Sequence, residues 1–132
     1  MTAICTIINK VCTVHASDSL VTLRKPDGTL EPREWRRSKI ARVEHFPGAM
    51  SFWGLAEIRD GRKSERMSDW LKRFAGQARS FASPQEFALK LRDELQSAIG
   101  RMRFLRPLDA GLGVHFTAYE RIRGFSVPEL FL

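Results

Sequence analysis

The sequence predicts a single α+β domain built from antiparallel sheets and two consecutive helices. Short β-branched segments occupy the first part and the end of the 132-residue chain, whereas the middle has the apolar spacing of amphipathic helices. The connections at Asn9-Lys10 and Pro47-Gly48 are too short for crossovers between parallel strands. We therefore expect one layered sandwich over residues 1–132, with mainly antiparallel neighbours.

Four strands are expected before the helices. The first two are residues 2–9 and 11–17, with Asn9-Lys10 as the hairpin connection. Residues 20–24 are expected to extend the second strand, and the turn residues of KPDGTLEP (25–32) to form a loop. Residues 38–46 and 49–58 are the next two strands, and the second is so apolar that both of its faces should be buried.

Two amphipathic helices and two closing strands follow. Ser68 and Asp69 suit the start of the first helix. Its apolar stripe is Trp70, Leu71, Phe74, Ala75 and Ala78. In the second helix, SPQE places Ser83 as N-cap, Pro84 at the first position and Glu86 in a capping box. Its apolar face is Phe87, Leu91, Leu95, Ala98, Ile99 and Met102. Residues 113–122 and 125–132 are expected to pair through Arg123-Gly124.

The charge balance leaves one binding function open. The net charge is +7, which favours nucleic acid, anionic membrane surfaces or acidic peptides. The basic residues are scattered except in REWRRSK (33–39), where arginines flank Trp35 in a way that suits phosphate and base contacts. A solvated loop would have the same composition. The alternative function is therefore a noncatalytic basic module that binds nucleic acid or an acidic partner through Arg33–Lys39.

Several other classes of protein are not indicated. The chain lacks an apolar run of about 18 residues and a signal-peptide pattern, so we expect a cytoplasmic protein without membrane contact. Cys5 and Cys12 lie on apolar segments and should pack as reduced thiols. The three histidines, His15, His45 and His115, are isolated in the sequence and lack the spacing of metal ligands. We therefore expect no metal site, and we expect these histidines to have ordinary packing or surface roles. No nucleotide-binding or serine-hydrolase motif is present, and we expect no cofactor.

The amino terminus offers a complete nucleophile. If Met1 is removed, Thr2 carries a hydroxyl and a free α-amine, and the amine can accept the hydroxyl proton directly or through water. A nearby lysine would favour the neutral amine by like-charge repulsion, and a carboxylate would hold that lysine in place. Asp18 and Lys39 are available for these roles. Gly54 could offer a backbone N–H to a developing oxyanion.

The order of these residues resembles the proteasome-like branch of the N-terminal nucleophile (Ntn) hydrolases. The opening TAICTIINKVCTVHASDSLVT is similar to the family's first strands, with Asp18 sixteen positions after Thr2, and SKIARV and SFWGLAEI are similar to its lysine-led and glycine-bearing strands. The resemblance implies an αββα sandwich with Thr2, Asp18, Lys39 and Gly54 as catalytic residues. It also implies a peptide or small amide substrate, a homo-oligomer and, as for the bacterial ring peptidase, an ATP-driven unfoldase partner.

Three departures from the family pattern accompany the resemblance. His45-Phe46-Pro47 leads unusually into the glycine strand, Trp53 is bulky beside Gly54, and the chain ends at Leu132 where the relatives continue with further elements. The expected sandwich therefore lacks its C-terminal portion. A naturally shortened hydrolase, a degenerate noncatalytic relative and a truncated reading frame all fit this ending.

Overall fold

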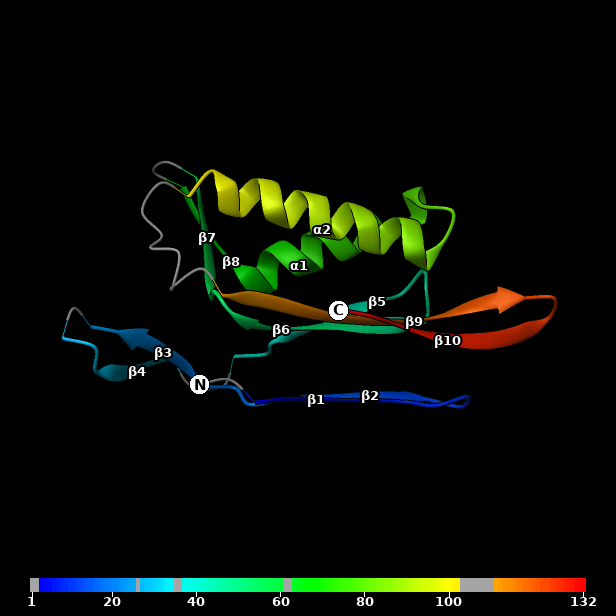
Figure 1. Cartoon of the computed structure of the whole chain (residues 1–132), viewed down its shortest axis with the longest axis horizontal. Coiled ribbons are helices and arrows are strands. Elements are labelled where there is room, and N and C mark those ends of the chain that lie inside the picture. Colours follow the sequence, from blue (N-terminus) through cyan, green and yellow to red (C-terminus); the bar gives the residue numbers. More distant parts are fainter. Residues whose placement is uncertain (1–2, 26, 35–36, 61–62, 103–110) are drawn as a thin grey trace.

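The protein combines antiparallel sheets with two α-helices (Figure 1). The computed structural model describes residues 3–25, 27–34, 37–60, 63–102 and 111–132. Within these ranges the strands form one four-stranded sheet and three two-stranded sheets, and every strand pairing is antiparallel. The mixed α/β class and the antiparallel sheets predicted from the sequence are thus confirmed.

The central sheet has the strand order β10-β9-β6-β5. It joins β5 (Ile40–Val43) and β6 (Gly48–Gly54) to β9 (Leu112–Ile122) and β10 (Phe125–Phe131). Arg123 and Gly124 connect β9 to β10 with φ angles of 51° and 85°, as a tight hairpin turn needs. Because β6 pairs with β9, segments that are far apart in the sequence meet in the middle of this sheet.

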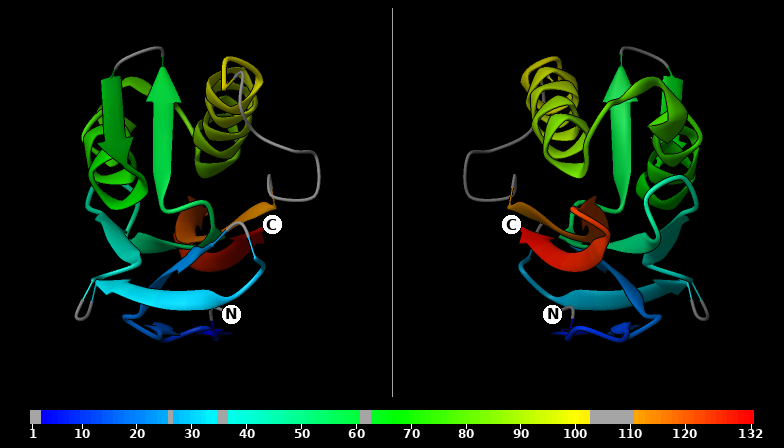
Figure 2. Two further views of the ribbon diagram at one scale, coloured as in Figure 1. Left: turned by 90° about the vertical axis from the view of Figure 1, so that its left-hand side faces the viewer. Right: turned by 90° about the vertical axis from the view of Figure 1, so that its right-hand side faces the viewer.

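Both helices cover the same face of the central sheet (Figure 2). They are α1 (Met67–Ala75) and α2 (Pro84–Gly100), with the short 3-10 helix η1 (Ala78–Ser80) between them. The predicted N-cap of α2 is present, because Ser83 Oγ accepts from the Glu86 N–H at 3.1 Å. The Glu86 carboxylate accepts from the Ala82 N–H instead of from Ser83. Ser68 and Asp69 lie in the first turn of α1 as expected, whereas the N-cap is Arg66, which makes no side-chain cap bond.

The apolar core lies between the helices and the central sheet. Phe87 of α2 is fully buried, and its ring centroid lies 5.0–6.1 Å from those of Phe46, Phe74, Phe81 and Phe116. These rings come from four different segments of the chain, so a single aromatic cluster joins the helices to the sheet. The apolar stripes expected on the two helices supply much of the core, which also includes Trp70, Leu71, Leu91, Leu95 and Ala98.

A separate hairpin covers the opposite face of the central sheet. It consists of β1 (Ile4–Ile8) and β2 (Thr13–Ser17), and β2 packs against β6 and β5 (Figure 1). The connection has four residues where two were predicted, because Asn9 Oδ1 accepts from the N–H groups of both Val11 and Cys12 at 2.8 Å. The described layers are thus helices, central sheet and β1–β2 hairpin.

Two further hairpins differ from the predicted elements. Residues 20–24 do not extend β2; β3 (Val21–Arg24) pairs with β4 (Leu30–Glu34), so only the centre of the predicted loop is a turn. Pro32 is tolerated in β4 because a two-stranded sheet leaves an edge unpaired. The strand predicted over 49–58 ends at Gly54, where φ is +93°, and a new hairpin of β7 (Glu57–Asp60) and β8 (Lys63–Arg66) begins after it.

Candidate active site

A buried ion pair joins two of the four candidate catalytic residues. Lys39 Nζ lies 2.7 Å from Asp18 Oδ1 and also donates to the carbonyl oxygen of Leu20 at 2.7 Å. The Lys39 side chain is 5% exposed and that of Asp18 is 29% exposed. A buried ammonium is costly unless a carboxylate and further acceptors compensate it. Asp18 and Leu20 supply this compensation and fix the position of the Lys39 ammonium.

Backbone hydrogen bonds place this ion pair where the β1–β2 hairpin meets the central sheet. The Asp18 N–H donates to the Ala3 carbonyl at 3.0 Å, which extends the β1–β2 ladder to the residue before β1. The Phe52 N–H donates to the Lys39 carbonyl at 3.2 Å, which extends the β5–β6 ladder in the same way. Asp18 and Lys39 therefore lie beside the beginning of the hairpin and beside β6 at once.

Thr2, the predicted nucleophile, lies outside the described residues. Its covalent neighbour Ala3 is described, and the Ala3 carbonyl accepts the hydrogen bond from the Asp18 N–H. The backbone of Asp18 is thus bonded to the residue that follows Thr2 in the sequence.

Gly54 ends β6 in a conformation that requires glycine. Its φ is +93°, and a Cβ atom added there would overlap the carbonyl oxygen of Gly111. Gly54 is exposed and lies two residues beyond Phe52, whose N–H bonds Lys39. The structure therefore brings Asp18 and Lys39 into contact and puts Gly54 at the same end of β6. The backbone conformation alone is enough to explain a glycine at this position.

The basic segment 33–39 does not form one exposed patch in the described part of the chain. Lys39 is buried and bonded to Asp18, so it is not available to a nucleic acid or an acidic partner. Arg37 is half-buried, and its N–H donates to the Ser19 carbonyl at 3.0 Å. Trp35 and Arg36 lie outside the described residues. Lys39, the last residue of the predicted Arg33–Lys39 binding segment, points into the protein and therefore cannot contribute to a binding surface.

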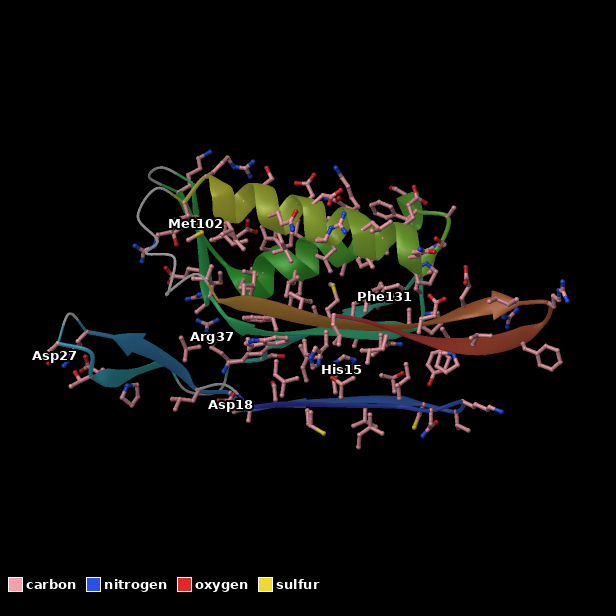
Figure 3. All side chains as sticks on the ribbon, in the orientation of Figure 1. His15, Asp18, Asp27, Arg37, Met102 and Phe131 are labelled. Atoms are coloured by element: carbon pink, nitrogen blue, oxygen red, sulfur yellow. The ribbon has the colours of Figure 1, made fainter. Side chains whose placement is uncertain are left out.

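A hydroxyl and imidazole network lies between the hairpin and the central sheet, and the sequence analysis missed it. His15 points from the hairpin toward the central sheet (Figure 3). Its Nδ1 lies 2.9 Å from Ser51 Oγ, and its Nε2 lies 2.7 Å from Thr117 Oγ1. His115 Nδ1 lies 3.0 Å from Thr6 Oγ1. Burial, and secondly the charge of His115, lowers the pKa of His15, which favours its neutral form. His15 Nδ1 also lies 3.5 Å from Thr6 Oγ1, so Thr6 connects His15 and His115.

The two cysteines differ from their expected role. Both Cys5 and Cys12 are free thiols, but both are exposed. Cys5 points outward because the residues on either side of it in β1 face the central sheet. Neither cysteine therefore packs as a buried small hydrophobe.

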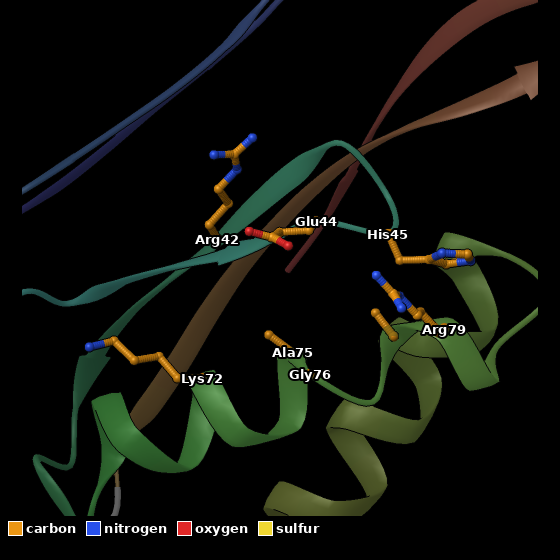
Figure 4. Close-up of a pocket in the computed structure, with 8 residues that line it drawn as sticks. Arg42, Glu44, His45, Lys72, Ala75, Gly76 and Arg79 are labelled. Carbon is orange, nitrogen blue, oxygen red and sulfur yellow. The ribbon is translucent and has the colours of Figure 1, made fainter.

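A surface pocket of about 330 Å³ lies between β5 and the end of α1 (Figure 4). Arg42, Lys72 and Arg79 line it together with Glu44 and His45. The remaining lining residues are alanines and a glycine, so none of the residues that border this pocket carries a hydroxyl or thiol nucleophile. The pocket is thus a cationic surface feature separate from the Asp18–Lys39 pair.

The described residues form neither a metal site nor a membrane-spanning helix. Among the described residues, no three His, Cys, Asp or Glu side chains are grouped so that they could hold a metal ion. Neither helix in the described ranges has the length and apolar character needed to cross a membrane. No protein-family model, curated protein or solved structure significantly matches the chain.

Proposed function

We propose that the protein is an N-terminal threonine hydrolase of the proteasome-like Ntn type, which cleaves an amide or peptide bond through an acyl-enzyme on Thr2. The observation that carries this proposal is the buried contact between Lys39 and Asp18, one hydrogen bond away from Ala3. The αββα arrangement of the family is part of the proposal. Three of its four layers have counterparts in the described residues, namely the helices, the central sheet and the β1–β2 hairpin, and no described helix lies outside the hairpin (Figure 1).

The ion pair provides what an N-terminal nucleophile needs. After removal of Met1, the α-amine of Thr2 must be neutral to accept a proton from the hydroxyl. An ammonium nearby favours the neutral amine by like-charge repulsion. Because Lys39 is held by Asp18 and by the Leu20 carbonyl, its charge stays in one place through the reaction. Lys39 thus tunes the amine, and Asp18 positions Lys39.

The reaction proceeds in two steps on Thr2. Its Oγ attacks the amide carbonyl carbon, and the hydroxyl proton passes to the α-amine. The C–N bond then breaks, the leaving nitrogen takes that proton, and the acyl group remains on Oγ as an ester. Water attacks this ester, one of its protons passes through the amine to Oγ, and the carboxylic acid is released.

Gly54 has the oxyanion role in this proposal. The carbonyl oxygen of the substrate gains negative charge during the attack, and a fixed backbone N–H stabilises that charge. Gly54 is exposed at the end of β6, where the absence of a side chain lets a substrate approach the main chain. Its position two residues beyond the Lys39-bonded Phe52 supports this assignment.

Covalent labelling tests the proposal. Intact mass is expected to show that the purified protein lacks Met1. After treatment with an epoxyketone or a β-lactone, the mass should show one adduct per chain. Thr2→Ser keeps both the hydroxyl and the amine and should still be labelled, whereas Thr2→Ala should not. An adduct that persists in Thr2→Ala contradicts the assignment of the nucleophile.

The same protein preparation distinguishes the alternatives. A chain that loses Met1 but forms no adduct fits a degenerate Ntn relative. Salt-sensitive nucleic-acid binding that survives Thr2→Ala and disappears when Arg33, Arg36 and Arg37 are neutralised would instead favour the noncatalytic basic module.

A further inference from the structure

The β1–β2 hairpin is attached to the rest of the protein in an unusual way. None of its described residues belongs to the apolar core, which lies on the other face of the central sheet. Its exposed outer face carries Cys5, Ile7, Val14 and Ala16. Its inner face carries Thr6, Thr13, His15 and Ser17 beside Ile4 and Ile8. Hydrogen bonds therefore contribute much of what holds this hairpin on the sheet.

His15 is the centre of these hydrogen bonds. Its two ring nitrogens bond hydroxyls on two neighbouring strands, Ser51 of β6 at 2.9 Å and Thr117 of β9 at 2.7 Å. Ser51 and Thr117 are both fully buried, so water cannot replace the imidazole without rearrangement. His115 bonds Thr6 on the neighbouring strand of the hairpin. One side chain of the hairpin thus bridges the two middle strands of the central sheet.

The neutral form of His15 suits this position. A neutral imidazole has one N–H donor and one acceptor, and hydroxyl groups can serve as either partner. Burial lowers the pKa of His15 and so favours this form at neutral pH. Removal of the ring would leave two buried hydroxyls without their partner, which costs more than the loss of an exposed hydrogen bond.

We propose that His15 is a positioning residue of the hydrolase, which holds the nucleophile-bearing hairpin in register with the sheet that carries the other catalytic groups. This inference rests on the proposed function. The hairpin begins next to Thr2 and leads into Asp18, whereas Lys39 leads into β5 and Gly54 ends β6. A shift of the hairpin on the sheet therefore changes the distance of the nucleophile from its partners. A displacement of about 1 Å can lower a rate by about a hundredfold.

The test compares His15→Ala with His15→Gln and with the matched control Val14→Ala, which removes an exposed outer-face side chain from the same strand. Hydrogen exchange measures the opening of the hairpin and of the core separately. Labelling with a β-lactone at several concentrations gives kinact and KI. For His15→Ala we expect hairpin exchange to rise and kinact to fall by about tenfold or more, with KI and the exchange of core amides unchanged.

Two further variants separate the loss of the His15 hydrogen bonds from a general effect of mutation in β2. His15→Gln keeps an amide that can reach Thr117 and should recover part of kinact, and Val14→Ala should behave as wild type. If His15→Ala does not fold, Thr117→Val removes one of the two bonds of His15 with a side chain of similar shape, and it should show the same pattern more weakly.

Distinct results would overturn the proposal. Faster hairpin exchange with wild-type kinact would show that the docking does not position Thr2. Unchanged hairpin exchange in both His15→Ala and Thr117→Val would show that the network does not hold the hairpin. A wild-type protein that forms no adduct overturns the hydrolase proposal itself, and the role of His15 falls with it.

Discussion

Replacement of Lys39 by methionine is expected to slow the labelling of Thr2 strongly while the chain still folds. Methionine fills a similar volume without charge, and the Asp18 carboxylate left behind is 29% exposed and can be hydrated. Replacing a buried ion-pair member by an apolar side chain of similar size is often tolerated. Without the ammonium, the α-amine of Thr2 loses the charge that favours its neutral form, so kinact should fall about a hundredfold or more.

A matched control separates this effect from a general loss of charge. Lys90 forms an exposed pair with Glu94 on α2, with a nitrogen to oxygen distance of 2.9 Å. Lys90→Met removes the same charge far from the candidate site and should leave kinact unchanged. Circular dichroism checks that both variants keep their fold. A Lys39→Met protein that reacts as fast as Lys90→Met would remove Lys39 from the mechanism.

Replacement of Asp18 by alanine is expected to lower the free energy of unfolding strongly, whereas Lys39→Met should leave the chain folded. The Lys39 ammonium is 5% exposed, and it would keep the Leu20 carbonyl but lose its carboxylate partner. Breaking a buried pair by removing one partner costs about 3–5 kcal/mol, and the partial exposure of Asp18 puts our expectation near the lower value. Urea unfolding followed by fluorescence measures this difference in the free energy of unfolding.

The double variant Asp18→Ala with Lys39→Met provides the internal control for this prediction. It removes the ammonium that has lost the Asp18 carboxylate in the single variant, so it should be more stable than Asp18→Ala alone. Equal stability of the single and double variants would show that the ion pair does not determine the cost. The unfolding free energies and kinact values of these variants together separate the contribution of Lys39 to stability from its contribution to reactivity.

The helices and the long strands were predictable because their signals are local. The Ser83-Pro84 start of α2 and the aromatic stripe of α1 depend on neighbours within one or two turns. The β3–β4 and β7–β8 hairpins were missed because their strands are short, polar and, in β4, interrupted by Pro32. Pairing with a partner strand decides such segments, and periodicity does not show that partner.

The contacts of the candidate site are not local, so the sequence alone predicted few of them. The contact between Asp18 and Lys39 could be proposed only by combining chemistry with a family resemblance, since no local pattern relates the two positions. The hydroxyl and imidazole network could not be seen, because His15 and His115 meet only when the hairpin lies on the central sheet. One signal was present in the sequence: strand alternation puts Thr6, Thr13 and His15 on one face and Ile7 and Val14 on the other. The structure places the face with Thr6, Thr13 and His15 against the central sheet.

Trapping of the acyl-enzyme tests the central claim most directly. Protein lacking Met1 is mixed with a peptidyl ester, quenched with acid within a single turnover, digested, and mapped by tandem mass spectrometry. The account predicts the acyl group as an ester on Thr2 of the N-terminal peptide, absent in Thr2→Ala and strongly reduced in Lys39→Met. An acyl group on any other residue, or its undiminished presence in Lys39→Met, would contradict the account.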